Sequence, residues 1–273
     1  MPTWPLIDHG AITSVGTASG AGTTVTASTT ANTKGSYTQL TASTPQAAGA
    51  IIVSLVAGAA ADMLVDLAIG AAGSETVIVA NLTTSVGTGG SNNQGAPLLL
   101  PISIPAGTRL AARCQATVGS STCQVAVHLL RSTLIMASGL SRVVTIGADT
   151  TDSGGITIDP GATLNTKGAW VQMTASLSIP IRALAIGIGN RANGVSTSAN
   201  FLIDIGIGAA GSETVLISNI HLREDAGADV VAPNRSPLIP AAIPVGARIA
   251  VRAASSITDA TDRLLDCILY GVG

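Results

Sequence analysis

The sequence predicts an all-β chain made of two tandem jelly-roll-like β-sandwich domains. Three observations support this fold class. Segments recur in the same order about half a chain apart, and short windows alternate apolar and polar residues. Glu and Lys are scarce, and Gly, Ser and Thr interrupt every window that could form a helix. The length of 273 residues also fits two ordinary domains.

The internal repeat is the strongest signal in the chain. Three segments recur in both halves: GAAGSETV at 70–77 and 208–215, NTKG at 32–35 and 165–168, and I-P-x-G-x-R-[IL]-A-x-R at 104–113 and 243–252. Solenoid repeats are about 20–50 residues long, so this much longer period indicates duplicated whole domains. We place the first domain, with a short N-terminal arm, at 1–138 and the second at 139–273.

The beginning of the chain allows two interpretations. The Ser, Thr and Gly content of 13–30 fits either a flexible arm or an exposed edge strand. Trp4, Pro5, Leu6 and Ile7 are a candidate anchor to a neighbouring protein, or an ordinary first strand.

The segment 63–69 predicts a half-buried strand, because Val65 and Leu67 alternate with Asp66. The glycine-rich stretch 70–74 predicts a turn, and the β-branched residues of 76–79 complete a hairpin. A phosphate-binding loop would lead into a helix, and none is predicted here. Segment 109–114 predicts another strand with one solvent-facing side.

Further strands are predicted at 51–56, 124–130, 181–188 and 264–270. About eight strands in each half, separated by Gly, Pro and Asn turns, are typical of a jelly roll. The order of the strands stays open at this point.

Composition argues against several classes of function. Charged residues make up 10% of the chain and the net charge is -2, so a nucleic-acid partner is not expected. Mean hydropathy is +0.51, but no apolar run approaches the roughly 18 residues of a membrane span, so no membrane partner is expected. The first ten residues lack a signal-peptide pattern, which predicts synthesis in a cytoplasm. Aromatic residues make up 2%, which argues against the stacking platforms of a glycosidase.

No catalytic, cofactor or metal site is predicted. The loose cluster of His221, Glu224 and Asp225 is interleaved with an arginine and is interpreted as a solvated loop. Cys114 and Cys123 flank a predicted hairpin turn, so they could form a cross-strand disulfide or remain small buried thiols. An odd cysteine count favours free thiols.

Four arginines and two aspartates are the candidate site residues. They repeat between the halves: Arg109, Arg113, Arg248, Arg252, Asp66 and Asp204. Two interpretations are open. They form structural ion pairs across neighbouring strands, or the arginines contact another subunit. Tyr37 and Trp170 occupy matching positions and are interpreted as packing residues.

The repeated G-A-A-G-S-E-T-V and I-P-x-G-x-R-[IL]-A-x-R segments resemble a module of structural proteins from tailed bacteriophages. The resemblance covers mainly the second half of each copy. It implies a non-enzymatic virion component made in the host cytoplasm, with other phage virion proteins as partners. A capsid decoration or cement protein is the leading expectation, and a tail or baseplate module that binds a receptor or carbohydrate is the alternative. Duplication and hydropathy favour a homo-oligomer, with a trimer preferred.

Overall fold

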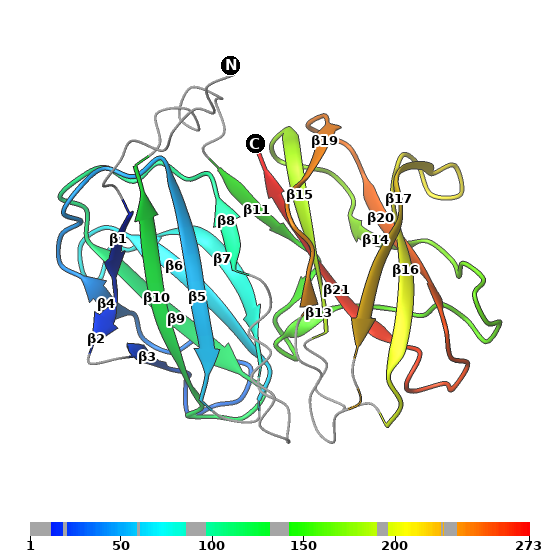
Figure 1. Ribbon diagram of the computed structural model, residues 1–273, viewed down its shortest axis with the longest axis horizontal. Helices are drawn as coiled ribbons and strands as arrows, with labels where there is room; N and C mark the ends of the chain where they lie inside the picture. Colours follow the sequence, from blue (N-terminus) through cyan, green and yellow to red (C-terminus); the bar gives the residue numbers. More distant parts are fainter. Residues whose placement is uncertain are drawn as a thin grey trace, which may run out of the picture.

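In the computed structural model the chain forms two sandwiches side by side (Figure 1). The structure describes residues 12–18, 21–58, 61–85, 97–131, 142–189, 196–224, 226 and 234–273. Strands between residues 12 and 130 build the first sandwich, and strands between 143 and 272 build the second. The proposed boundary at 138 and 139 and the candidate anchor at 4–7 lie outside the described residues.

The first sandwich consists of two antiparallel sheets. The sheet that we call the β5 sheet has the order β2 (Thr17–Ala18), β3 (Ala21–Thr26), β10 (Thr122–Leu130), β5 (Ala50–Ala57) and β8 (Leu98–Leu100), and β1 (Ile12–Val15) also pairs with β10. The β6 sheet has the order β4 (Thr38–Thr41), β9 (Leu110–Ala116), β6 (Met63–Ile69) and β7 (Thr76–Thr84).

The second sandwich repeats this plan. The β15 sheet has the order β12 (Ala148–Asp149), β13 (Gly154–Ile158), β21 (Leu265–Val272), β15 (Ile181–Ile188) and β18 (Asn234–Arg235); β11 (Val143–Ile146) also pairs with β21, and β19 (Ile239–Ile243) with β15. The β16 sheet has the order β14 (Val171–Thr174), β20 (Ile249–Ser255), β16 (Ala199–Ile207) and β17 (Thr214–Glu224).

The strand order in both halves is that of a jelly roll. From β3 to β10 the chain changes sheet at every connection except the β6–β7 hairpin, and the last strand lies beside the first in the middle of its sheet. The second half follows the same route from β13 to β21, except that the consecutive strands β18 and β19 lie in the same sheet. Two antiparallel sheets connected in this way are typical of a jelly roll, and they confirm the predicted all-β sandwich fold class.

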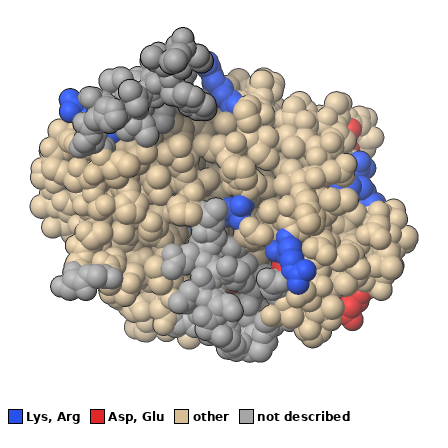
Figure 2. Space-filling view, in the orientation of Figure 1, with Lys and Arg blue, Asp and Glu red and all other residues tan. Residues whose placement is uncertain are grey.

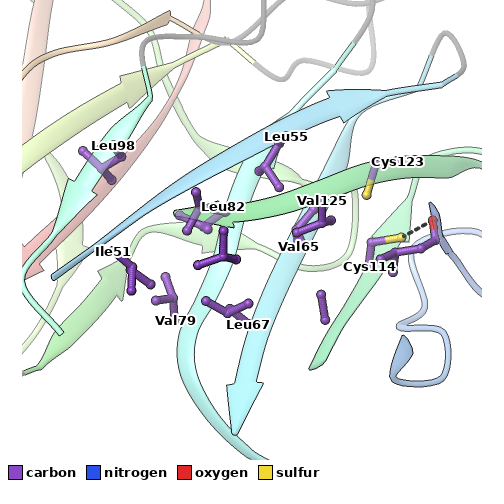
Figure 3. Packing of buried hydrophobic residues seen from close by; sticks show 14 of the residues in the cluster. Ile51, Leu55, Val65, Leu67, Val79, Leu82, Leu98, Cys114, Cys123 and Val125 are labelled. Atoms are coloured by element: carbon purple, nitrogen blue, oxygen red, sulfur yellow. Dashed lines mark hydrogen bonds between the residues drawn. The ribbon is translucent and has the colours of Figure 1, made fainter. Parts of the chain in front are cut away.

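Aliphatic side chains fill the space between the sheets. In the first sandwich Leu55 and Val125 of one sheet face Val65 and Leu67 of the other (Figure 3). Each of these side chains contributes about 1.5–3 kcal/mol by leaving water. In the second sandwich Phe201 is fully buried and takes part in the equivalent cluster.

The link between β9 and β10 was predicted as a hairpin turn, and this prediction is wrong. The two strands belong to opposite sheets, so residues 117–121 cross the end of the sandwich. Cys114 and Cys123 lie inside it as free thiols (Figure 3), and the Cys114 thiol donates to the Val25 carbonyl at 3.7 Å. Alternating sequence did not distinguish a turn within one sheet from a crossing between two.

The solvent-facing sides expected for segments 63–69 and 109–114 are largely covered. Leu64, Asp66 and Ala68 of β6 are buried, and in β9 only Arg113 is partly exposed. Ion-pair partners cover part of this outer face, and the second sandwich covers another part. At the beginning of the described chain, residues of the segment 13–30 form β1, β2 and β3, as the edge-strand interpretation requires.

Candidate functional site

Each sandwich carries the same cluster of charges on its outer face. In the first, the two carboxylate oxygens of Asp66 bind different cations: Oδ1 lies 2.8 Å from Lys34 Nζ, and Oδ2 lies 3.0 Å from Arg113 Nε. The Lys34 ammonium also donates to the Leu64 carbonyl at 3.0 Å and to Asn81 Oδ1 at 2.9 Å. Asp66 is therefore held by two cations on the surface of the β6 sheet, and one of them is itself fixed by neighbouring groups.

Asp204 has the same partners in the second sandwich. Its Oδ1 lies 2.6 Å from Lys167 Nζ and its Oδ2 lies 3.0 Å from Arg252 Nε, while Lys167 donates to the Leu202 carbonyl at 2.9 Å. Lys34 and Lys167 are the lysines of the two NTKG segments. The repeated motifs at 32–35 and 165–168 thus supply the lysine of each cluster. Their position in the sequence does not indicate that these lysines pair with Asp66 and Asp204.

A β-bulge delivers a further hydrogen bond to each aspartate. Asn81 in β7 and Asn219 in β17 both have φ of 55°, and the strand register shifts beside them. This left-handed conformation is open to asparagine at low cost, and it points the backbone N–H at the carboxylate, at 3.0 Å in the first sandwich and 2.9 Å in the second.

The remaining candidate arginines bind the hairpin turns. Arg109 Nη1 lies 3.0 Å from Glu75 Oε1 and donates to the Gly70 carbonyl at 2.9 Å. Arg248 makes the same two contacts in the second sandwich, at 2.8 Å to Glu213 and 3.1 Å to Gly208. The glutamates of the two GAAGSETV segments therefore fasten the turn to the neighbouring strand.

Aromatic rings lie beneath the central arginines. The Arg113 guanidinium carbon is 4.6 Å from the centre of the Tyr37 ring, and that of Arg252 is 4.5 Å from the Trp170 ring. Such cation–π contacts contribute about 0.5–1 kcal/mol at partly exposed sites. Both rings thus pack on the sheet face and have one side occupied.

The surroundings shift the proton affinities of the clusters. Burial opposes ionisation of Asp204, but hydrogen bonds from Lys167, Asn219 and Arg252 outweigh it and hold the pKa of this carboxyl below its usual range. Burial lowers the pKa of Lys34, although Asp66 acts in the opposite direction. Desolvation opposes ionisation of Glu75 and Glu213, but backbone hydrogen bonds and the hydrogen bonds from Arg109 and Arg248 hold the pKa of each carboxyl below its usual range.

A buried polar contact joins the two sandwiches. The Tyr270 hydroxyl of β21 accepts from the Thr83 N–H of β7 at 3.0 Å and donates to the Asn81 carbonyl at 3.1 Å. Arg235 of β18 donates to the Thr83 carbonyl. The Arg235 side chain is buried, which lowers the pKa of its guanidinium. β7 thus receives hydrogen bonds from two strands of the β15 sheet.

Other groups extend this contact at both ends. Thr145 of β11 donates its hydroxyl to the Ala80 carbonyl at 2.5 Å. Gln115 of β9 donates to the Thr150 carbonyl at 2.8 Å and to the Ser153 hydroxyl at 3.0 Å. Apolar packing accompanies these bonds, since Ala185, Ile268 and Tyr270 of the second sandwich belong to the buried cluster of the first.

The residues of this contact were not predicted from the sequence. Arg235 stands outside the repeated motifs. Tyr270 was treated only as part of the last strand, and Gln115 follows Cys114 without any signal. A comparison of the two halves could have found Tyr270, because a buried-strand position that carries Tyr in one copy carries His128 in the other.

The described surface has few charges, and shallow hollows occur on both sheets of the first sandwich. Figure 2 shows one face on which uncharged residues predominate. One hollow of about 500 Å³ lies beside the Asp66 cluster, where Lys34, Asp66 and Arg113 are paired with one another. Another, of about 440 Å³, lies on the β5 sheet and is lined by small and uncharged residues. Within the described ranges, no group of three or more His, Cys, Asp and Glu side chains could hold a metal ion, and no helix has the length and apolar character to cross a membrane.

Comparisons with known proteins give likenesses among solved structures but no match by sequence. No protein-family model matches the chain, and no curated protein matches it by sequence. Among solved structures, the chain is similar to "Crystal Structure of the STIV MCP", a viral capsid protein, with 11% sequence identity, a TM-score of 0.35 and coverage of 96% of each chain. A likeness at this TM-score does not extend a function to the present chain.

Proposed function

We propose that the protein is a non-enzymatic structural protein of a tailed-phage virion, and specifically a capsid decoration or cement protein or another assembly component. The observation that carries this proposal is the contact between the sandwiches. Thr83, Tyr270 and Arg235 are buried in it, and Thr83 is hydrogen-bonded to both of the others. Such a contact joins two jelly rolls into one block, which is the property that a building unit requires.

The charged side chains support the same conclusion. In each half the conspicuous carboxylates and arginines bind one another in ion pairs that fix strands and turns. A general acid or base needs a group that can reach a substrate. In Asp66 and Asp204 each carboxylate oxygen instead binds a cation, and Oδ1 also accepts a backbone N–H. Their arrangement serves the stability of the sheet face.

The aromatic residues favour assembly over sugar binding. Carbohydrate sites present open aromatic faces to the ligand, but Arg113 and Arg252 lie on Tyr37 and Trp170. The alternative of a receptor-binding or carbohydrate-binding tail module therefore has no feature among the described residues in its favour.

This proposal includes an oligomer, for which we prefer a trimer, and a boundary between the domains at 138 and 139. Three chains would present six similar sandwiches, which suits a position of threefold or sixfold symmetry in a particle. Size-exclusion chromatography with light scattering measures the stoichiometry. We expect three copies per assembly; a mass that is not a multiple of three chains contradicts the trimer.

Localisation in intact particles tests the function itself. Purified phage particles are labelled with gold-conjugated antibody against this chain and imaged by electron microscopy. We expect label at regular positions on the head. Label on the tail alone would favour the receptor-binding alternative, and particles without the protein would overturn the proposal.

A further inference from the structure

The contact between the sandwiches joins unlike surfaces. The first sandwich contributes the outer face of its β6 sheet, through β7 and β9, and the second contributes the outer face of its β15 sheet, through β11, β18 and β21. Because both halves have the same fold, each half also has a sheet face equivalent to the one that the other half contributes to the contact. The outer face of the β16 sheet and the outer face of the β5 sheet are the two corresponding surfaces.

On the β16 sheet the residues that match Leu64 and Thr83 are exposed, whereas Ala254, which matches Gln115, is buried. Leu64 in β6 corresponds to Leu202 in β16, since each stands two residues before the aspartate of the ion-pair cluster. Leu64 is 0% exposed beneath the second sandwich, whereas Leu202 is 40% exposed. Thr83, which pairs with Leu64, is buried, and His221, which pairs with Leu202, is exposed. The equivalent of the covered face thus presents an apolar side chain to solvent.

On the β5 sheet the matching residues are half-buried. His128 corresponds to Tyr270, because His128 pairs with Ser14 in β1 and Tyr270 pairs with Thr145 in β11. The imidazole of His128 lies between hydroxyls, with Nδ1 2.8 Å from Ser14 and Nε2 3.2 Å from Ser54. Ala126 and Ile52 are half-buried neighbours of His128. They correspond to Ile268 and Ala185, which are fully covered beside Tyr270.

We propose that the β16 face of one chain docks onto the β5 face of a second copy and repeats, between molecules, the contact that joins the two sandwiches within one. This inference rests on the proposed role in assembly and names its partner. The occupant is a second copy because each exposed surface matches a surface that the chain already covers with its other half. The hollow on the β5 sheet, lined by Ser54, Val56 and Ala126 among others, receives the apolar part of the incoming face.

The proposed contact is heterologous, because its two sides differ. Repetition of such a contact builds a ring when the rotation closes and a filament when it does not. In a ring of three chains, six sandwiches would be joined by six related contacts, three within chains and three between them. By correspondence, Ser14 of one copy approaches the Ser218 carbonyl of the next, as Thr145 approaches Ala80.

Cysteine crosslinking tests the predicted neighbours. In the full chain Ser14→Cys is combined with Ser218→Cys, and a short bismaleimide is added; the native cysteines Cys114, Cys123 and Cys267 are buried. We expect covalent dimers and higher species on a denaturing gel. The control combines Ser14→Cys with Ser212→Cys in the exposed hairpin turn, and it should yield little product. Equal yields from the two pairs would overturn the proposal.

A substitution on the exposed face tests the energy of docking. Leu202→Asp should shift the concentration at which chains associate by at least about tenfold, as expected for an apolar anchor. Val245→Asp is the matched control, because Val245 is 61% exposed in a turn outside the two faces. Circular dichroism and thermal unfolding of Leu202→Asp should match those of the unaltered chain.

The outcomes separate this inference from the proposed function. If the chain associates but Leu202→Asp has no effect, the docking faces are wrong and an assembly role through other surfaces stands. If the chain stays monomeric at every concentration that light scattering can reach, the docking proposal is overturned, while the gold-labelling experiment still decides whether the protein belongs to the particle.

Discussion

Asp66 and Asp204 each hold one sheet face together at the scale of single residues. Each carboxylate is buried and binds a lysine, an arginine and a backbone N–H. Removal of the aspartate charge leaves a partly buried lysine and arginine without their counter-charge, which costs more than loss of an exposed pair.

Asp204→Asn should therefore lower the free energy of unfolding by about 1–3 kcal/mol. The amide keeps the shape of the side chain but loses its charge toward Lys167 and Arg252. Urea denaturation followed by circular dichroism measures the change. Asp159→Asn is the control, since the side chain of Asp159 is 50% exposed in its pair with Arg263, and it should cost less than about 1 kcal/mol. Equal losses in the two variants would show that burial does not set the cost.

Trp170 and Gly206 form a pair that differs between the two halves. A Cβ atom at Gly206 would lie 2.8 Å from the Trp170 ring, so glycine leaves the room that the indole occupies. The corresponding pair in the first sandwich is Tyr37 and Ala68. In the first sandwich the smaller aromatic ring, that of Tyr37, is thus matched with the larger of the two small residues, Ala68.

Gly206→Ala should destabilise the protein by about 1–3 kcal/mol, because the methyl group collides with the indole. Combination with Trp170→Tyr reproduces the pair of the first sandwich and should recover part of this loss. Thermal unfolding of the two single variants and the double variant gives the coupling energy. Purely additive losses would argue against the steric explanation.

At the scale of elements, the bulges in β7 and β17 place the hydrogen bond to each aspartate. Asn219 is exposed, so its left-handed backbone conformation is the main requirement at this position. Asn219→Ala should cost about 1–2 kcal/mol of folding free energy, whereas Asn219→Gly should be nearly neutral. Denaturant unfolding of both variants checks the prediction. An alanine variant as stable as the glycine variant would contradict it.

Much of the element structure followed from the sequence. The strand at 63–69 and its hairpin were predicted from the alternation around Asp66 and from the glycines at 70 and 73, whose φ values of 112° and 82° favour glycine. The prediction failed where a connection changed sheet, as between Cys114 and Cys123, because local alternation is the same for both kinds of link. The pairing of Asp66 with Lys34 was also missed, since these residues lie 32 positions apart and no local pattern joins them.

At the scale of the whole molecule, the contact between the sandwiches contains a buried phenolic hydroxyl that both accepts and donates a hydrogen bond. The Tyr270 hydroxyl is the acceptor for the buried Thr83 N–H, and a buried donor without an acceptor costs about 1–3 kcal/mol. Arg235 cannot replace it, because its guanidinium only donates.

Tyr270→Phe should therefore weaken the coupling between the halves. Calorimetry should show one unfolding transition for the unaltered chain and an earlier or divided transition for the variant. Tyr37→Phe is the control: it also removes a phenolic hydroxyl but keeps the ring that Arg113 covers. A Tyr270→Phe variant with an unchanged transition would mean that the packing of Ala185 and Ile268 suffices to hold the halves together.

The position of the last strand of each sandwich has a consequence during synthesis. β10 and β21 lie in the middle of their sheets, so neither jelly roll can close before its final strand has been translated. Domains made first generally fold first, and non-local strand pairing is slow. The first sandwich can therefore form while the second is still an open chain, which leaves Leu64 and Thr83 without a cover. Until translation reaches Tyr270, the outer face of the β6 sheet stays exposed and prone to association. Chaperone binding in that interval would protect the nascent chain from other nascent chains on the same messenger RNA.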